Sequence, residues 1–480
     1  MPAIVTNKFR LNNAEQFYES FAEASTSYYL FVGRPQPWTI TTPFGGGTDS
    51  APPTPLDNVD DEYMYYRDMQ AAKRITSSDI QYAIPRHNWT TGTTYDYYRG
   101  DYGAQWSSNS ANIVKTVNNG TNLWASTTLF YVLSSANNVY KCIRNSPGAP
   151  TVGGGSAVAS TVEPTGTSNS ELTTGDGYVW KYMYTLTTSQ ITNFLTADFM
   201  PVATDSTVSS AAVDGAIRNY RIMAGGSGYT NNTYTSIAVN GDGASAVVTV
   251  IVSGGAVTSV ASTAAGTGYT FATLDIDAIS NIGGGSGAVV TPIIGPKGGH
   301  GYNAINELGG FYVMTNTSIA STEGAGDFVV DQDFRRVGVV LNPYNYGTTT
   351  VATASTLSAL KAMTFDASPA PGTFVIDEVI TGGTSGAKGK VVSWDSTTRI
   401  LKYIQTQWTG VETTGADKNK LTAFAVAEVV TGDGSATGTI GSLTNPEVAY
   451  YSGMAIYAED RSPITRATDQ TENIKLIVEF

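Results

Sequence analysis

The chain has 480 residues, which exceeds the size at which one hydrophobic core keeps growing, so we expect several structural units. Its 27 basic and 40 acidic side chains give a formal net charge of −13, which repels phosphate backbones and anionic lipid surfaces and argues against nucleic acid and membrane partners. Charged residues make up 14% of the chain, against roughly 25% in an ordinary soluble domain, and such a surface is typical of a protein packed against neighbours.

Cysteine content and the first residues bear on the folding compartment. The single cysteine, Cys142, excludes disulfides and thiolate metal sites within the chain, which indicates a reducing compartment. The start, MPAIVTNKFR, lacks the pattern of a secretion signal, and no apolar run reaches the roughly 18 residues of a membrane span. We therefore expect a soluble protein made in the cytoplasm.

In chain order, the pattern predicts few helices and many strands. Residues 12–24 offer an Asn N-cap followed by Ala14, Phe17 and Phe21 at helical spacing, which indicates a short amphipathic helix. Segments 77–84 and 188–195 begin with capping residues but are soon stopped, the first by Pro85. Strands are predicted where β-branched and aromatic residues gather between turn formers, in NLWASTTLFYVL, VYKCI, YVWKYMYTL, GGFYVM and RRVGVVL.

Two regions repeat internally. GSGYT at 226–230 recurs as GTGYT at 266–270, and AVVT at 246 recurs at 288. FVIDEVITGGTSGAKGKV from 374 recurs as FAVAEVVTGDGSATGTI from 424, so that Glu378 corresponds to Glu428. Both regions predict small β modules built from hairpins, with glycine at the tight turns.

Candidate catalytic residues are few, and each has a plainer interpretation. His87, in YAIPRHNW, and His300, in KGGHGY, lack a nucleophile motif nearby, so a turn or interface role is favoured. The acidic cluster of Asp57, Asp60, Asp61 and Glu62 does not have the spacing of a calcium loop and is predicted to be a solvated loop. GGTSGAKGKV lacks the Ser or Thr that a phosphate loop requires after lysine. No cofactor or metal site is predicted.

Tyrosine-rich stretches point to a binding surface. DEYMYYRDM and YDYYRGDY combine tyrosine with arginine and acid, a composition that fits a protein interface or a sugar site better than stacking on nucleic acid bases. For the tryptophans, including Trp38, Trp89 and Trp180, burial in a core is the default interpretation.

Several motifs, in order along the chain, resemble one known family. They are AIVTNKFR near the start, GRPQPW at 33–38, AIPRHNW at 83–89, GDGYVWKYMYTL at 175–186, RRVGVVLNP at 335–343 and SGMAIYAEDRSPITRATDQTENIKLIVEF at the end. The chain is similar in these segments to the baseplate wedge subunit of T-even-type contractile-tailed phages, the gene product eight family. The resemblance covers about the first 200 residues, a segment around 298–343 and the last 35, whereas the repeat-bearing regions are not part of the family pattern.

The resemblance implies a non-enzymatic structural protein of the virion tail baseplate, synthesised and assembled in the bacterial host cytoplasm. It implies a homodimer that contacts other baseplate wedge proteins, and tail fibre proteins are a further candidate partner. The family pattern places an arginine where His87 stands, so a mechanism that depends on imidazole is not expected. The expected interface or fold-fixing residues are Trp38, Pro85, Arg86, Trp89, Tyr178, Trp180, Arg461, Asp469, Gln470 and Glu472, with Pro85 and Trp89 fixing a turn and Arg86 making a polar contact.

In the C-terminal motif, Arg461, Asp469 and Glu472 put opposite charges close together, which suits an orienting ion pair at a domain or subunit contact or, equally, within the chain's own surface.

The expected fold is a β-rich α+β fold, with a layered, mostly antiparallel β core, a few short helices and two inserted small all-β modules. We expect wedge core at 1–222, a first inserted module at 223–297, core strands at 298–345, a second inserted module at 346–445 and a core segment at 446–480. Loops tolerate such insertions at small entropic cost.

Two other functions compete with the wedge subunit. One is a fibre or spike-type receptor-binding protein whose Gly-Tyr repeats hold host glycans. The other is a depolymerase that uses acidic residues such as Asp60 and Asp61, an idea supported only by the number of acids.

Overall fold

The computed structural model describes residues 5–38, 47–100, 104–109, 112–117, 123–124, 127–145, 158–320, 328–405, 422–467 and 470–480. The chain divides into two compact units. The first consists of Met1–Glu15, Gln81–Met314 and Ile477–Phe480, and the second of Gln16–Ile80 and Thr315–Leu476. Four elements run from one unit into the other, namely α1 (Asn7–Ser20), β3 (Ile80–Pro85), β18 (Tyr312–Ile319) and β28 (Glu472–Glu479). The structure is mostly antiparallel β with short helices, which confirms the predicted fold class.

The second unit is built on a five-stranded sheet. Its order is β20 (Thr356–Ser358), β2 (Met69–Ile75), β1 (Tyr28–Gly33), β19 (Asp333–Leu341) and β27 (Met454–Thr465). All six residues of β1 are buried, because alternate side chains enter the two hydrophobic clusters on either face, Leu30 and Val32 one and Tyr29 and Phe31 the other. Gly338 faces Phe31 on the neighbouring strand, where a Cβ would lie 2.4 Å from the ring.

Helices α1 and α2 (Val59–Arg67) differ from the sequence-based expectation. Helix α1 begins at Asn7, not at residue 12, because the Thr6 hydroxyl accepts the Phe9 N–H at 3.3 Å and acts as the N-cap. The predicted solvated loop at the acidic cluster is instead the start of α2, where the Asn58 side chain accepts the Asp61 N–H at 2.9 Å. Acidic residues favour the first turn of a helix because its backbone N–H groups carry partial positive charge.

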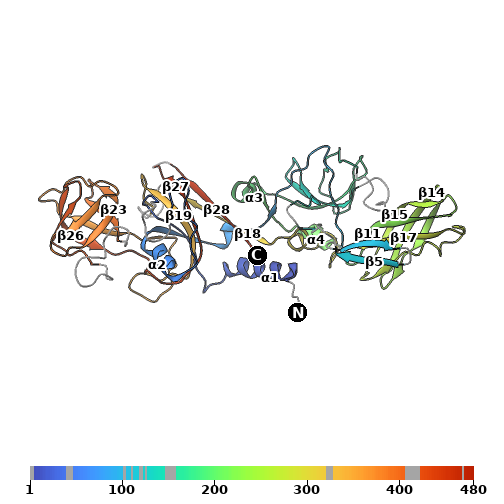
Figure 1. The fold of residues 1–480 in the computed structure, drawn as a ribbon, viewed down its shortest axis with the longest axis horizontal. Helices are drawn as coiled ribbons and strands as arrows, with labels where there is room; N and C mark the ends of the chain where they lie inside the picture. Colours follow the sequence, from blue (N-terminus) through green and yellow to red (C-terminus); the bar gives the residue numbers. More distant parts are fainter. Residues whose placement is uncertain are drawn as a thin grey trace. The chain divides into compact units, whose positions relative to one another are not determined.

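The second unit also contains a closed six-stranded barrel, which Figure 1 shows around β23 and β26. Its order is β21 (Lys361–Phe365), β24 (Ile400–Ile404), β23 (Lys388–Asp395), β22 (Val379–Gly382), β25 (Val429–Gly432) and β26 (Thr437–Thr444). The first and last strands pair, with Ala362 opposite Thr444. The barrel therefore begins and ends at one place, with its own core around Phe365, Val391 and Ile440.

The two sequence repeats of the barrel bind each other's turns. The Glu428 carboxylate accepts the N–H groups of Thr384 and Ser385 at 3.1 and 2.9 Å, and the Glu378 carboxylate accepts the N–H of Gly434 at 2.9 Å. Strands β22 and β25, one from each repeat, pair antiparallel about Thr381 and Thr431. The two repeats thus form one barrel, and they are related to each other by an approximate twofold axis.

The first unit has a four-stranded sheet of order β6 (Tyr131–Leu133), β7 (Asn138–Arg144), β9 (Val179–Thr185) and β8 (Leu172–Thr173). Its other elements are β3 (Ile80–Pro85), paired with β10 (Phe199–Pro201), the hairpin β4 (Ala104–Asn109) and β5 (Asn112–Val117), and the short helices α3 (Thr188–Phe194), α4 (Ser206–Ser210) and α5 (Ala304–Leu308). Residues 77–84 hold a single 3-10 turn, η1 (Ser77–Asp79), and then continue as β3, because the apolar run IQYAI suits a buried strand.

The first repeat region forms a β module in which strands pair across the repeats (Figure 1). β11 (Ile217–Ser227) pairs with β17 (Ser286–Ile294), and β14 (Ala244–Ser253) pairs with β15 (Ala256–Thr267) and with β12 (Asn232–Ala238), while β13 (Asn240–Gly241) pairs with β16 (Ala272–Thr273). The Tyr229 hydroxyl accepts the Ala288 N–H at 3.1 Å, and the Tyr269 hydroxyl accepts the Ala246 N–H at 3.3 Å. Each repeated tyrosine therefore contacts the AVVT strand of the other repeat.

Candidate functional site

The segment around His87 is a tied-down turn that follows β3. The Arg86 guanidinium donates to the Asn88 side-chain oxygen at 2.9 Å and to the Thr196 carbonyl at 2.8 Å. The Trp89 indole donates to the Ser160 hydroxyl at 3.2 Å, and the Pro85 carbonyl accepts the Tyr131 hydroxyl at 2.9 Å. Burial lowers the pKa of His87, so its imidazole is neutral near pH 7. The imidazole packs on the ring of Tyr131, with ring centroids 5.0 Å apart.

Tyr178 and Trp180 lie at the centre of the core of the four-stranded sheet. Both are fully buried, and their rings stack with centroids 5.5 Å apart. The neighbouring Asp176 carboxylate accepts the N–H groups of Thr161 and Val162 at 2.8 and 3.0 Å. Asp176 stands inside the GDGYVW motif but was not among the predicted site residues, because in sequence a carboxylate in a Gly-rich turn resembles any surface acid.

Trp38 belongs to a buried charge cluster in the second unit. Its indole donates to the Arg461 carbonyl at 3.0 Å, and the Arg34 guanidinium lies over its ring at 4.6 Å. Beside it, Arg336 binds Asp460 at 2.7 Å and Asp68 at 3.2 Å. Burial raises the pKa of both carboxyl groups, and the charge of Arg336 opposes that rise.

The C-terminal motif forms ion pairs other than the expected one. Glu472 pairs with Arg466 at 2.8 Å, and both side chains are buried. Arg461 pairs with Glu459 at 3.3 Å, since residues two apart on β27 share a face of the strand. The Gln470 N–H donates to the Ala467 carbonyl at 3.3 Å, and Asp469 lies outside the described residues.

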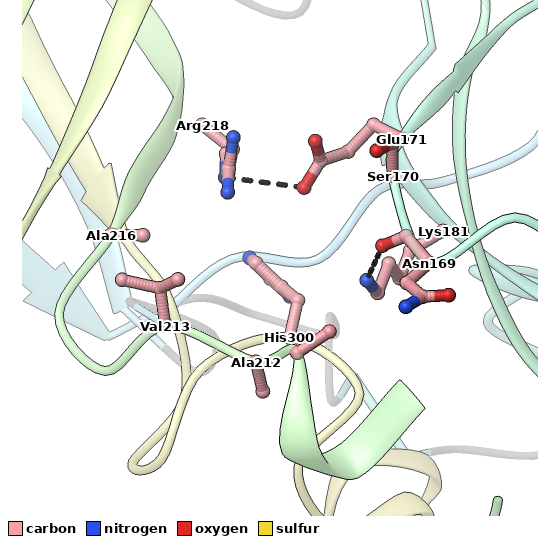
Figure 2. Close-up of a pocket in the computed structure, with 10 residues that line it drawn as sticks. Asn169, Ser170, Glu171, Lys181, Ala212, Val213, Ala216, Arg218 and His300 are labelled. Atoms are coloured by element: carbon pink, nitrogen blue, oxygen red, sulfur yellow. Dashed lines mark hydrogen bonds and ion pairs between the residues drawn. The ribbon is translucent and has the colours of Figure 1, made fainter. Parts of the chain in front are cut away.

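The pocket in Figure 2 is a polar cavity of about 250 Å³ in the first unit. Lys181 comes from β9, Arg218 from β11 and His300 from the loop before α5. Arg218 pairs with Glu171 at 3.1 Å, while the Lys181 ammonium donates to the Asn169 carbonyl. The Glu307 carboxylate holds the His300 loop by accepting the Gly301 N–H at 2.9 Å.

A groove of about 520 Å³ lies on the second unit, between α2 with the segment before it and strand β27. β27 is an edge strand of its sheet. Large apolar side chains are exposed along this groove and at its end: Leu56, Val59, Met454 and Ile456. Exposed apolar side chains gathered around a groove are typical of surfaces that associate with another protein.

The described residues offer little for catalysis. Among them, no group of three or more His, Cys, Asp or Glu side chains is placed to hold a metal ion. Cys142 is buried, which raises the pKa of its thiol well above the usual value. In that same part of the chain, no helix is both long enough and apolar enough to cross a membrane.

Packed β sheets, buried ion pairs and an exposed apolar groove are the main features of this β-rich protein among the residues described. Residues 3–214 match the family model described as Bacteriophage T4, Gp8, so this part of the chain is similar to that family. No curated protein matches the chain. That family consists of structural proteins of the phage baseplate wedge, and the match supports a place for the chain in the virion tail.

Proposed function

We propose that the chain is a baseplate wedge subunit that forms a homodimer, joins neighbouring wedge proteins and turns over no substrate. The family match over residues 3–214 carries this proposal. The low charged fraction of 14% supports it, because permanent interfaces bury charge-poor surface. Tail fibre proteins remain a further proposed partner.

The two repeat regions are proposed insertions in this wedge subunit. Ile217 pairs with Ile294, and Ala362 pairs with Thr444, so each β module leaves and rejoins the chain at one place. The expected boundaries need adjustment, because 223 falls inside β11, and 346 lies before β20, which pairs with β2. We therefore propose modules at 217–294 and 361–444, with wedge core in the remaining segments.

The groove beside β27 is the proposed dimer surface. An edge strand has unpaired backbone groups along one side, and an antiparallel strand pair can be formed by two copies of the same strand about a twofold axis. Exposed Met454 and Ile456 on β27 would then be covered by the second copy.

Light scattering across a concentration series tests the dimer. The expected mass is about 101 kDa, twice the chain mass of 50.6 kDa. Ile456→Asp should shift the mass toward 50.6 kDa, because a charge would be buried at the contact. Ile251→Asp, which changes an equally exposed isoleucine of the first module, is the matched control and should stay dimeric. A monomeric wild-type chain would refute the proposed dimer. A dimeric Ile456→Asp variant would show that the dimer contact lies elsewhere.

A glycan receptor-binding role is not favoured by the Gly-Tyr repeats. Tyr229 and Tyr269 are 4% and 3% exposed, and both belong to the core of their module. Their hydroxyl groups hold backbone N–H groups, so the rings are not available to stack on a sugar.

A further inference from the structure

The polar cavity of Figure 2 has an excess of positive charge. The positive charges of Lys141, Lys181 and Arg218 interact electrostatically with His300. The carboxylates that interact electrostatically with Lys181 are those of Glu171 and Glu307. Lys141 pairs with Glu307, and Arg218 pairs with Glu171. Within the described part of the chain, no carboxylate forms an ion pair with Lys181, so one positive charge has no counterion.

His300 is a buried polar group at this cavity with an unused nitrogen. The residue is 6% exposed, and its Nδ1 has no hydrogen-bond partner among the described residues. Figure 2 shows its imidazole directed from its loop toward the Arg218–Glu171 pair. Nδ1 itself is closed off from solvent, so a ligand oxygen in the cavity would meet the edge of the imidazole that lines it and would accept a hydrogen bond from a ring nitrogen there when that nitrogen carries a proton.

The loop that carries His300 is firmly placed. The Glu307 carboxylate accepts the N–H groups of Gly301 and Asn303, at 2.9 and 3.1 Å. At Gly301, with φ of +92°, a Cβ would lie 3.0 Å from the Lys181 side chain, so glycine lets the loop approach the lysine closely. His300 and Lys181 are therefore held at the cavity before any ligand arrives.

We propose that this cavity binds a single oxyanion, a phosphate or a carboxylate, through Lys181, Arg218 and His300. A volume of about 250 Å³ is below that of a typical site for a drug-sized ligand, at roughly 300–1,000 Å³, and suits one small group. The anion would neutralise the charge of Lys181 and share the Arg218 guanidinium with Glu171. Its source is either free phosphate or an acidic side chain of a neighbouring protein, and only the second source rests on the proposed function.

The histidine content makes this proposal testable in the full chain. With two histidines in 480 residues, histidine-selective isotope labelling gives two imidazole signals, assigned with His87→Asn. Titration with inorganic phosphate should shift the His300 signal saturably and raise its apparent pKa, whereas the His87 signal stays in place. Sodium chloride at equal ionic strength controls for screening. A His300 signal that responds to neither phosphate nor acetate at about 100 mM overturns the proposal, since that corresponds to negligible affinity.

Variants identify the side chain that binds the anion, and the use of more than one variant keeps the test valid if one of them fails to fold. Lys181→Met should weaken phosphate binding at least about tenfold, because a charge-assisted hydrogen bond is lost. Lys361→Met, at a half-buried lysine of the barrel that donates to Gln405 at 2.6 Å, is the matched control and should bind as the wild type does. Glu171→Gln retains all three cations and should bind several-fold tighter. Unchanged affinity in both Lys181→Met and Glu171→Gln would overturn the assignment.

Acetate, as the stand-in for a side-chain carboxylate, distinguishes the two sources. Binding of phosphate alone identifies a free-ion site. Comparable binding of acetate identifies a site for a partner's acidic side chain. Either result stands if the chain proves monomeric, so failure of the proposed dimer and failure of this site are separable.

Discussion

At the scale of single residues, the buried charge cluster of Arg336 is the most consequential feature. Its carboxylate partners Asp68 and Asp460 lie 268 and 124 residues away in the sequence, with side chains 1% and 2% exposed. In sequence, RRVGVVLNP stands out only as a predicted strand and as part of the family resemblance. Partners so distant cannot be inferred from local patterns, because only the sheet register brings them together.

Replacing Arg336 with Met should destabilise the second unit by about 3–5 kcal/mol, because two carboxylates would remain buried without their cation. Urea unfolding measures the difference. Arg461→Met is the control, since its pair with Glu459 is exposed and contributes about 0–1 kcal/mol. Equal losses in the two variants would show that the buried cluster contributes no more than a surface pair.

Asp176 gives the chain an acid-dependent stability. Partial burial raises the pKa of this carboxyl, but hydrogen bonds from Thr174, Val162, Thr161 and Ser160 prevail and lower it from 3.8 to about 2. A folded pKa below the unfolded value means that the contribution is present above about pH 4 and is lost as the pH falls toward 2.

Asp176→Asn should therefore be less stable than the wild type at pH 7, and the gap should close between pH 4 and pH 2. Thermal unfolding followed by circular dichroism at a series of pH values measures this. A gap that stays constant across that range would rule out the ionised carboxylate as the stabilising form.

At the scale of elements, several strands and the hairpins of the repeats were predictable, but the pairing between repeats was not. VYKCI, YVWKYMYTL and RRVGVVL correspond to β7, β9 and β19. The repeats were predicted to form hairpins, and β22 with β23, β25 with β26 and β14 with β15 are such pairs, while strands of the two repeats also pair with each other in both modules. Local turn residues favour pairing between strands that are neighbours in sequence. The contacts of Tyr229, Tyr269, Glu378 and Glu428 with the opposite repeat favour pairing between the two repeats.

Two glycines of one repeated turn separate backbone strain from crowding. Gly268 has φ of +74° with open space at its Cβ position, so Gly268→Ala should cost about 1–2 kcal/mol from backbone conformation alone. Gly266 has φ of +64°, and a Cβ there would lie 2.5 Å from the Ala244 carbonyl oxygen. Gly266→Ala should lower the free energy of unfolding by roughly a further 1–3 kcal/mol, which urea unfolding measures. Equal losses of stability in the two variants would mean that the strands paired between the repeats move apart easily.

At the scale of the whole molecule, the proposed insertion of the barrel predicts that the barrel can be removed. Joining Leu360 to Asn445 deletes 361–444 and leaves β20 paired with β2, because Ala362 and Thr444 are already neighbours. The shortened chain should fold and keep the mass of a dimer in light scattering. Deletion of the longer segment 346–445 should destabilise it, since Ala352 and Leu357 are core residues. A monomeric product of the shorter deletion would place the barrel in the dimer contact.

The exchanged contacts of the repeats bear on how such modules arise and persist. A polypeptide with one copy of the GxGYT and AVVT pair would have a tyrosine without its strand and a strand without its tyrosine, and only a second polypeptide could complete it. Tandem fusion turns that encounter into an intramolecular one, with an effective concentration in the millimolar range for a short connection. The fused form is therefore insensitive to dilution, a useful property for a particle that assembles in a crowded cell and then disperses into its surroundings.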